Sequence, residues 1–554
     1  MRNPEHAESG ILYNMFVDLS RKKILVIDDF SDFRKALRKM MESYGAKNVD
    51  EASNGEAAME KLEIKSYDIV LCDYNLGDGK KDGQQILEDA KHRGFIKYSC
   101  IYIMCTAENT MAMVMGAIEY QPDDYLVKPF SKEMLLNRLE KVMKKKKDFE
   151  DIERAIQKKD YMEAITLCDW KLAENPKNRF EYLRLKGDLL LKAAMYDDSI
   201  ELYNEVIAIR DLPWAQTGLG KAYFYLNNFE KAKEIFQYVV DTNVTYMEAY
   251  DWLAKTMDEL GALKEAQDVL LNAVDISPKS ILRQKAIGEI AYKNEDYDTS
   301  EKSFRTVLTL GKNSYLKSPT DFTGLAKTLV EKKAGDEALN VLGAIKSEFK
   351  NDNAAALQAA IAEGIVYKKL DRGEESRKAL EEAANMYENL AEQTSPDISM
   401  ELAKAYFTVG ETEKGTQMMK DIVRNHHEDD TVIKKVQGVF TDMKLSEEGA
   451  DIISATRQEI IRINNAGVRL VEEGRLKEAI EYFEKAAAGQ PDNKIINANA
   501  ALSVMLFMQK QGMTEQHMKL AGQYIERIRK VDPAHKKLPQ LLQMFRSLAE
   551  TRPQ

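Results

Sequence analysis

The sequence of 554 residues predicts an α/β doubly wound, parallel five-stranded sheet followed by an all-α array of repeated helices. Two observations predict this fold class. Short β-branched runs alternate with helical patterns up to about residue 145, whereas small residues recur at a nearly constant spacing beyond residue 150. A chain of this length is also too long for one hydrophobic core, so we expect more than one domain.

Four buried strands are predicted near the N-terminus, at residues 23–28 (KILVID), 69–73 (IVLCD), 101–106 (IYIMCT) and 125–130 (YLVKPF). Each run is apolar enough to be covered on both faces, as strands of parallel sheets are. Helical patterns lie between them, for example residues 31–45, which end at Gly45 as helices commonly do. The alternation implies about five βαβ units, so residues 22–145 are predicted to form one domain after an N-terminal extension, residues 1–21.

The last helix of this domain is predicted to begin at Ser131, a favourable N-cap residue, and to run into four lysines at 144–147. A lysine run can mark a nucleic-acid-binding patch. It is more often a solvated helix end, because cations are favoured at a helix C-terminus. We therefore expect the helix to end at these lysines, which would mark the exit into the next domain.

Residues 146–554 are predicted to form about ten helix pairs. In most repeats a small residue precedes a large one by a helical turn, and the first six small residues are 35, 33, 34, 34 and 38 positions apart. The spacing is lost between 425 and 455, where the series passes directly from Gly415 to Ala479. A helical bundle without repeats is the alternative. The small residues are Ala164, Ser199, Ala232, Ala266, Ser300, Ala338, Ser376, Gly415, Ala479 and Ala521.

Residues 253–278 and 466–491 resemble the tetratricopeptide repeat family, whose repeating unit is two antiparallel helices. The resemblance extends over roughly 150–540 and implies a superhelix. The concave face of such a superhelix would hold a helix or an extended segment of a protein partner. Tyrosines such as Tyr223 and Tyr225 are expected mostly to fill the space between helices, and a minority to be binding anchors.

Polar side chains follow the ends of the predicted strands: Asp28 and Asp29 the first, Asp73 the third, Thr106 the fourth and Lys128 the fifth. Ligands collect at this edge of a parallel sheet. Crowded carboxylates repel one another, and a hard cation such as Mg²⁺ relieves the repulsion. A lysine and a hydroxyl beside them suit a phosphoryl group. The sequence therefore predicts a magnesium-dependent phosphoryl-transfer site.

This set of residues resembles the receiver domains of bacterial two-component response regulators, which have a flavodoxin-like fold. The interval from Asp29 to Asp73 and the interval from Thr106 to Lys128 are both typical of chemotaxis-type receivers. The lysine precedes a proline, and the peptide bond at that place in the family is usually cis. The resemblance implies that Asp73 accepts the phosphoryl group. A degenerate receiver that takes no phosphate is the alternative.

The resemblance also implies roles for the other positions. Gly77 stands where the family commonly has proline, in a loop longer than usual, which leaves the loop dynamics and the phosphate lifetime open. The implied roles are metal binding for Asp28, Asp29, Asp73 and the backbone carbonyl of Asn75, phosphate binding and switching for Thr106, Ala107, Tyr125 and Lys128, and tuning of phosphate lifetime for Asn75 and Glu108.

The function implied is phosphorelay signal transduction. None of the six histidines lies in a recognisable kinase context, so a partner histidine kinase or phosphotransfer protein would supply the phosphoryl group, and the array would bind a protein under its control. One alternative is a nucleic-acid-binding regulator, which the net charge of −11 disfavours. The other is a phosphatase-like modulator of another regulator. The sequence has no nucleotide-binding loop, zinc-protease motif or nucleophile elbow, so we expect no further enzymatic output.

A cytoplasmic location is expected. The four cysteines lie in no metal-binding or CxxC spacing, and so few thiols in a long chain favour a reducing compartment. The first residues carry charges and lack the apolar core of a secretory signal. No uninterrupted apolar stretch is long enough to cross a bilayer, so no interaction with a membrane is expected.

Overall fold

A computed structural model of the protein describes residues 19–77, 80–97, 99–107, 122–174, 178–390, 394–532 and 535–550. The chain forms two compact units, Met1–Thr328 and Leu329–Gln554. The first unit contains a five-stranded sheet and the first repeated helices. The second unit is made of helices throughout its described residues.

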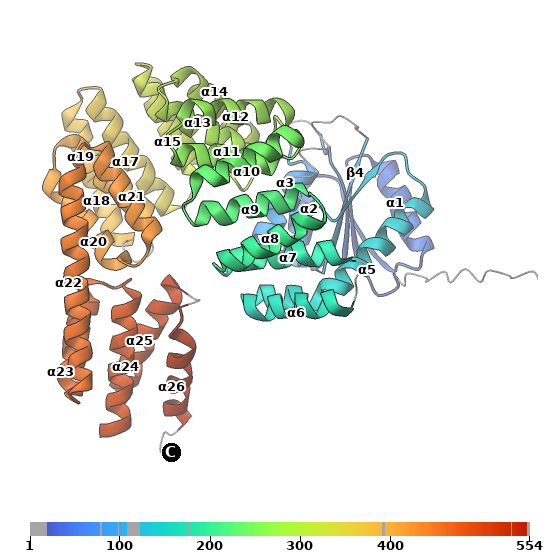
Figure 1. The fold of residues 1–554 in the computed structure, drawn as a ribbon. Coiled ribbons are helices and arrows are strands. Elements are labelled where there is room, and N and C mark those ends of the chain that lie inside the picture. The colour runs from blue at the N-terminus through green and yellow to red at the C-terminus, as the bar shows by residue number, and fades with distance from the viewer. Residues whose placement is uncertain are drawn as a thin grey trace, which may run out of the picture. The chain divides into compact units, whose positions relative to one another are not determined.

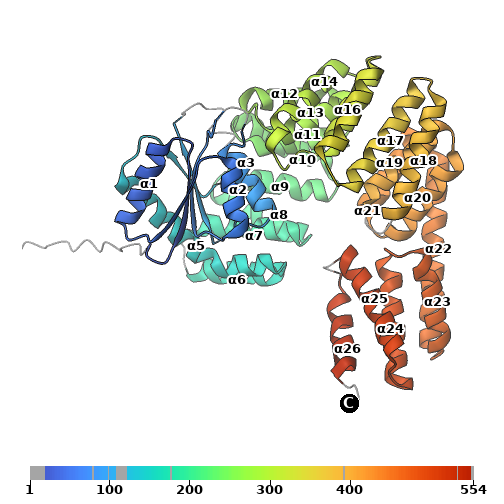
Figure 2. The ribbon, with the colours of Figure 1, turned by 180° about the vertical axis from the view of Figure 1, so that it is seen from behind.

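The sheet is parallel throughout and has the strand order β2-β1-β3-β4-β5, which confirms the predicted doubly wound fold. The sheet stands between α1 on one side and α2 and α3 on the other, as Figure 2 shows. Its strands are β1 (Lys23–Ile27), β2 (Asn48–Ala52), β3 (Ile69–Asp73), β4 (Ile101–Thr106) and β5 (Asp124–Val127).

Each face of the sheet packs against a pair of helices. On one face, α1 (Ser31–Ser43) and α5 (Lys132–Gln157) enclose a core that includes Ile24 and Leu71. On the other face, α2 (Gly55–Ile64) and α3 (Gly83–His92) enclose a core that includes Leu25 and Val70. Alternate residues of each strand thus enter different cores, as expected for strands that are buried on both faces.

The second strand, β2, was not identified from the sequence. It has the sequence NVDEA, and only Val49 and Ala52 are buried. It lies at the edge of the sheet and pairs with β1 alone, so its outer side needs no apolar cover. The fifth strand is shorter than predicted and ends at Val127. Pro129 follows closely and has no N–H group for a further ladder hydrogen bond.

The prediction that the helix after Ser131 ends at the lysine run is wrong. Ser131 does cap α5, since its side chain accepts a hydrogen bond from the backbone N–H of Met134, but the helix continues to Gln157. Apolar residues recur on both sides of the lysines: Leu139 enters the core of the sheet domain, whereas Ile152 enters the core of the first repeats. Because its buried stripe continues, the helix passes from one domain into the next.

Consecutive helices after α5 pack against one another in each unit, and α6 to α14 follow in order in Figure 1. In the first unit they are α6 (Tyr161–Glu174), α7 (Arg179–Lys192), α8 (Tyr196–Ile209), α9 (Pro213–Tyr225), α10 (Phe229–Thr242), α11 (Met247–Glu259), α12 (Leu263–Ile276), α13 (Ile281–Lys293), α14 (Tyr297–Leu310) and the short η2 (Gly311–Asn313). The helix α15 (Pro319–Glu331) begins in this unit and ends in the next.

The helices of the second unit are on average longer. They are α16 (Gly335–Glu348), α17 (Asn353–Lys369), α18 (Gly373–Leu390), α19 (Pro396–Val409), α20 (Thr412–His426), α21 (Asp430–Asp442), α22 (Ser446–Glu472), α23 (Leu476–Gly489), α24 (Lys494–Gln511), α25 (Glu515–Val531) and α26 (Leu538–Glu550).

The small residues that define the repeat lie where two helices approach closely. All ten members of the series are buried. Ser300 donates a hydrogen bond of 2.8 Å to the carbonyl of Gly288, and Ser376 donates one of 2.7 Å to the carbonyl of Gly364. Each of these pairs joins the two helices of one repeat. In these two repeats, the serine of the series is therefore in direct contact with a glycine twelve positions before it on the neighbouring helix.

The long interval in the series, from Gly415 to Ala479, contains a helix pair that the sequence pattern missed. Gly449 lies one repeat length after Gly415 and is buried beside the ring of Phe440. The missed pair is α21 with the first half of α22, and the second half of α22 packs on α23. Because one long helix belongs to two pairs, the usual turn between repeats is absent there.

Gly467 tests the close approach in the second unit. A Cβ atom on this residue would lie 2.3 Å from the ring of Phe483, which is fully buried. Gly467→Ala should lower the free energy of unfolding by about 2 kcal/mol, because an overpacked core shifts its helices apart. Gly438→Ala is the matched control in a helix interior with open space around it, and should be neutral or stabilising. Equal melting temperatures of the two variants would contradict a close approach of the two helices at Gly467.

Candidate functional site

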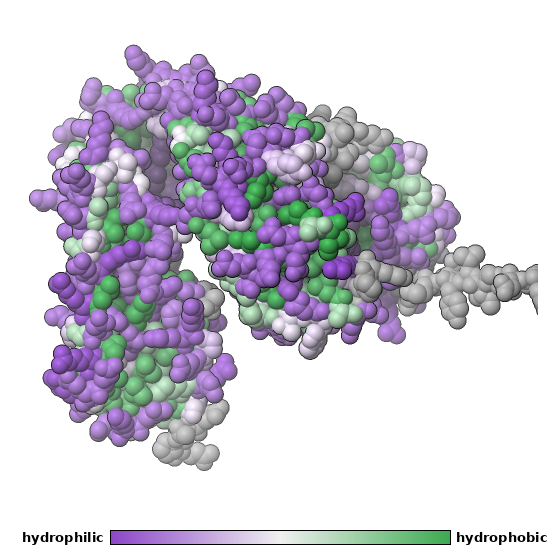
Figure 3. Space-filling view, viewed as in Figure 1, coloured by the Kyte–Doolittle hydropathy of each residue, from purple (hydrophilic) through white to green (hydrophobic). Residues whose placement is uncertain are grey.

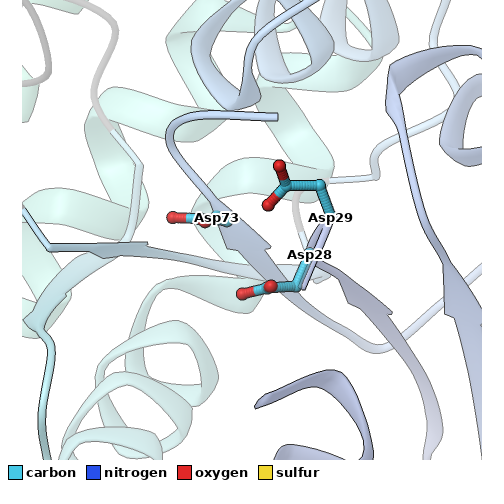
Figure 4. A group of neighbouring side chains, drawn as sticks. All are labelled: Asp28, Asp29 and Asp73. Atoms are coloured by element: carbon cyan, nitrogen blue, oxygen red, sulfur yellow. The ribbon is translucent and has the colours of Figure 1, made fainter. Parts of the chain in front are cut away.

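Three carboxylates meet at the carboxyl edge of the sheet. Asp28 and Asp29 directly follow β1, and Asp73 is the last residue of β3. One oxygen from each lies within 4.8 Å of the others. Figure 4 shows that the three side chains come from the ends of neighbouring strands and turn towards one space. The sequence predicted that these three residues lie together, because β1 and β3 are parallel and end at the same edge of the sheet.

The ammonium group of Lys128 lies between two of the carboxylates. Its Nζ is 2.7 Å from Oδ2 of Asp28 and 2.9 Å from Oδ2 of Asp73. Burial alone would lower the pKa of Lys128, but these two ion pairs outweigh burial and raise it above its ordinary value. The lysine therefore carries its charge at neutral pH and offsets part of the repulsion. The Lys128–Pro129 peptide bond is cis, as the family resemblance implied.

Asp28 is held in place by the start of α1. Its Oδ1 accepts a hydrogen bond of 2.8 Å from the backbone N–H of Phe30. Its backbone carbonyl accepts one of 2.6 Å from Arg34, whose guanidinium also pairs with Glu51 at 3.1 Å. The side chain of Asp28 is therefore fixed before any ligand binds, and it is fully buried.

Asp73 faces a small cavity of about 220 Å³. Burial raises the pKa of its carboxyl, and the charges of Asp28 and Asp29 raise it further, while the ion pair with Lys128 opposes both effects. Extra positive charge in the cavity would favour the ionised form. The cavity is lined by Asp29, Asp73, Tyr74, Asn75, Gly77, Thr106 and Ala107.

These residues fit a hard divalent cation. Three carboxylates face one lysine, so the site keeps an excess of negative charge, and all the ligand atoms are oxygens, which Mg²⁺ prefers. The cavity also has room for the waters and phosphate oxygens that normally complete such a coordination sphere. The residues at the site therefore match the predicted cofactor.

Three of the other predicted site residues, Asn75, Thr106 and Ala107, line the same cavity. Thr106 ends β4 and lines the cavity with Ala107, and the side-chain oxygen of Asn75 accepts a hydrogen bond of 3.1 Å from the backbone N–H of Gly77. Glu108 lies outside the described residues.

Tyr125 lies on β5, and its side chain packs against the core between the sheet, α2 and α3. Its hydroxyl is buried and has no hydrogen-bond partner among the residues that the structure describes. Burial, aided by the neighbouring Tyr74, raises the pKa of the Tyr125 phenol well above its ordinary value. This tyrosine is therefore uncharged at neutral pH, and its polar end has no partner in the part of the chain that the structure describes.

Three supporting residues were not predicted from the sequence. Arg34 holds the backbone of Asp28, and Tyr74 lines the cavity directly after Asp73. The Nζ of Lys128 lies 4.3 Å from the centre of the Phe33 ring, a favourable cation–π distance. Phe33 and Arg34 lie in the first turn of a helix that follows an acidic strand end, and this position is the only signal the sequence offers for them.

Comparison with protein-family models agrees with this geometry. Residues 24–140 match the response regulator receiver domain, and residues 215–242 match a tetratricopeptide repeat. The chain thus carries a response regulator receiver domain at its N-terminus. After this domain the chain continues as an array of helices, and one segment of that array matches the tetratricopeptide repeat model.

Individual proteins resemble one part of the chain or the other. The chemotaxis protein CheY-3 of Vibrio cholerae is 28% identical over 123 residues, which cover 22% of this chain and 92% of that protein. The chemotaxis protein CheY of Pseudomonas aeruginosa is also 28% identical over 123 residues and is covered to 97%. These relatives therefore match the receiver alone.

Two solved structures are each similar to one part of this chain. A tetratricopeptide repeat protein from Parabacteroides merdae is 14% identical with a TM-score of 0.33, over 46% of this chain and 96% of that one. A CheY-like receiver domain from Methanospirillum hungatei is 24% identical with a TM-score of 0.21, over 23% of this chain and 96% of that one.

Among the described residues, no helix has the length and apolar character that a membrane span requires.

Lys128 provides a test of the charge balance. Lys128→Met should lower the free energy of unfolding by about 3 kcal/mol without Mg²⁺, because it leaves buried carboxylates unpaired. Added Mg²⁺ should raise the melting temperature of this variant more than that of the wild type, since the cation replaces the lost charge. Lys141→Met, on the exposed side of α5, is the control. An equal Mg²⁺ response in all three proteins would contradict a magnesium site here.

Proposed function

We propose that the protein acts in phosphorelay signal transduction, with Asp73 as the acceptor of a phosphoryl group from a histidine kinase or a phosphotransfer protein. The observation that carries this proposal is the convergence of Asp28, Asp29, Asp73 and Lys128 at one sheet edge within a receiver domain. We assign the receiver to residues 22–145 after an extension over 1–21, and the array to residues 146–554.

In the proposed reaction, an oxygen of the Asp73 carboxylate attacks the phosphorus in line with the bond to the donor's imidazole nitrogen. The new bond joins aspartate oxygen to phosphorus, the phosphorus–nitrogen bond breaks, and the imidazole takes up a proton. Lys128, which pairs with Asp73 before the reaction, then stabilises the phosphoryl oxygens. A Mg²⁺ ion held by Asp28, Asp29, Asp73 and the carbonyl of Asn75 would supply further positive charge to those oxygens.

The remaining polar residues suit the proposed product. Thr106 lines the cavity and carries a hydroxyl group, so it is the residue we assign to binding the transferred phosphoryl group, beside the small Ala107. We assign Tyr125 to the switch because its buried hydroxyl lacks a described partner, and we assign Asn75 and Glu108 to the control of phosphate lifetime. These roles rest on the family resemblance together with the position of the described residues around the cavity.

Asp73→Asn tests the acceptor directly. Acetyl phosphate with Mg²⁺ should add one phosphoryl group to the wild-type chain and none to the variant, because an amide cannot form the acyl phosphate. Intact-mass spectrometry gives the stoichiometry. Asp151→Asn, on the exposed surface of α5, should label as the wild type does. Full labelling of the Asp73 variant would show that another residue is the acceptor.

We further propose that the array binds a protein partner in a groove of the first unit. The groove has a volume of about 1070 Å³ and is lined by one helix from each successive pair, namely α5, α7, α9, α11 and α13. Its lining combines aromatic rings such as Trp214 and Trp252 with charged residues of both signs, such as Asp188 and Lys221. Figure 3 likewise shows hydrophobic residues among hydrophilic ones over α7 to α9. This mixture suits an extended peptide segment with side chains of both kinds.

Leu282 tests the groove. It lines the groove and is 58% exposed, so Leu282→Asp should weaken capture of the partner about tenfold or more through burial of an unpaired charge. Ile209→Asp is the matched control, since Ile209 is equally exposed and does not line the groove. The partner is first identified by pull-down with phosphorylated wild type against Asp73→Asn. Equal binding by the two aspartate variants would place the contact elsewhere.

We infer that the output is binding rather than an enzymatic reaction, and that the receiver acts only on its own phosphorylation state. We place the protein in the cytoplasm, where the four cysteines, all free and buried, would remain reduced. The pull-down also tests the two other outputs. Recovery of DNA or RNA would favour a nucleic-acid-binding regulator, and loss of phosphate from a captured regulator would favour a phosphatase-like modulator.

A further inference from the structure

The helix α3 of the receiver is buried on more than one face. Ile86 and Leu87 enter the core beneath the sheet, as expected for a helix of a doubly wound domain. Gln84 and Glu88 are polar, yet they are only 6% and 7% exposed. The polar face of a helix on a domain surface normally stays in water. Another part of the chain must therefore cover this face of α3.

The cover comes from the repeats, far along the chain from α3. The amide of Gln85 donates a hydrogen bond of 3.2 Å to the carbonyl of Leu310, the last residue of α14. The hydroxyl of Ser314, which is itself buried, donates one of 3.4 Å to Oε2 of Glu88. Receiver and repeat segment thus meet through two polar contacts, of which the one between Ser314 and Glu88 is buried and the one between Gln85 and Leu310 is half-buried. Both belong to the same compact unit.

An aromatic contact extends this interface along α3. The rings of His92 and Tyr315 are stacked, with their centres 4.5 Å apart. Tyr315 lies in the connection between η2 and α15, and His92 is the last residue of α3. The repeat segment therefore follows α3 from its first turn to its end. We call residues 310–315 the docking segment.

The first turn of α3 is joined to the backbone of the phosphorylation site. The N–H group of Gly83 donates a hydrogen bond of 2.8 Å to the carbonyl of Tyr74. A Cβ atom on Gly83 would lie 2.2 Å from the carbonyl oxygen of Asp73, so nothing larger than glycine fits between α3 and the acceptor's main chain. The first turn of α3 is therefore in direct contact with the backbone that carries the Asp73 carboxylate.

Gln85 connects the docking segment to this turn. Its backbone N–H donates to Oδ1 of Asp82 at 2.8 Å, and its side-chain oxygen accepts from the backbone N–H of Asp82 at 3.1 Å. The same side chain donates to Leu310, so the capping box of α3 and the contact with the repeats share one residue.

A second contact reaches the other end of the connection between β3 and α3. The ammonium group of Lys279, between α12 and α13, lies 5.5 Å from the centre of the Tyr74 ring. Tyr74 follows Asp73 directly and lines its cavity. The positive charge of Lys279 also acts on Asp82, where it opposes the rise in the carboxyl pKa that burial causes. Both described ends of this connection are thus in contact with the repeat array.

We propose that the repeat array positions the phosphorylation site through α3, so that docking of the array and phosphorylation of Asp73 favour each other. Lys279 and the docking segment act as positioning residues in this scheme. They hold the described ends of the connection next to the acceptor, so these ends lose less conformational freedom when the phosphoryl group is bound. A phosphoryl group on Asp73 also adds negative charge beside Tyr74, towards which Lys279 is attracted. Because coupling between two sites is reciprocal, phosphate should in turn tighten the contact. This inference rests on the proposed function of Asp73.

The test uses the full chain and changes only residues of the repeats. The double variant Lys279→Ala/Tyr315→Ala removes the cation over Tyr74 and the ring over His92, and leaves every receiver residue intact. Its maximal rate of labelling by acetyl phosphate should fall about fivefold, the scale of two weak aromatic contacts, at an unchanged half-saturating concentration of donor. Lys279→Arg/Tyr315→Phe keeps the cation and the ring and should restore the rate.

The control is Lys302→Ala/Tyr482→Ala. Lys302 is exposed, as Lys279 is, and the exposed fraction of Tyr482 is nearly equal to that of Tyr315. No described interaction joins Lys302 or Tyr482 to the receiver. Circular dichroism and the melting temperature show whether each variant is folded. If the wild type takes no label, the proposed function itself fails. If the wild type takes the label and the double alanine variant labels equally fast, the proposed function stands and the positioning role is wrong.

Hydrogen–deuterium exchange tests the reciprocal effect. Acetyl phosphate with Mg²⁺ should slow amide exchange in peptides that cover residues 83–92 and 310–318 of the wild-type chain, and should leave exchange in Asp73→Asn unchanged. Slower exchange confined to the wild type supports mutual stabilisation. Unchanged or faster exchange in the docking segment of a fully labelled wild-type chain would overturn it, because phosphate would then not tighten the contact.

Discussion

The receiver depends on the position of one ammonium group between two carboxylates. The register of the sheet pairs Ile27 with Cys72, so Asp28 and Asp73 necessarily end side by side where β1 and β3 stop. Without a counter-charge these groups would repel each other at the centre of the domain. Lys128, which directly follows β5, supplies that charge from across the sheet. This arrangement depends on the strand order, on the end of β5 at Val127 and on the fixed orientation of Asp28. The site keeps a net negative charge, which suits a cation.

The parts of the fold that could be predicted are those with a local pattern. Strands buried on both faces are apolar throughout, and their ends in a parallel sheet share one edge, so the sequence could place Asp73 beside Asp28 and Asp29. The edge strand β2 could not, because an outer strand needs few apolar residues and Asp50 and Glu51 hide its pattern. The course of α5 was mispredicted for a different reason. Lysines are tolerated on the solvated side of any helix, and the spacing of Leu139, Val142 and Ile152 was the better guide.

The rest of the site depends on contacts that have no sequence signature. Arg34 reaches the carbonyl of Asp28 only because α1 packs beside β1, and the acceptor that it finds is a backbone oxygen, which any residue offers. The contact of Gln85 with Leu310 joins distant parts of the chain and again ends on a carbonyl. Such contacts follow from the packing of whole elements. In the same way Gly449 escaped the repeat pattern, because the long α22 replaces the turn that usually marks a repeat boundary.

Receiver and repeats are joined on both faces of the sheet, and this limits how they can move. The helix α5 packs on the face that contains Leu71 and continues without interruption into the first repeats, whereas α3 packs on the face that contains Val70 and meets the repeats through hydrogen bonds and a stacked pair of rings. A single helical connection would allow the repeats to rotate about its axis. The second attachment removes that freedom, and it does so at the helix whose first turn touches the main chain of Asp73. The repeats therefore oppose or favour phosphorylation of Asp73. The size of this effect equals the difference in the energy of their contacts with α3 between the unphosphorylated and the phosphorylated protein.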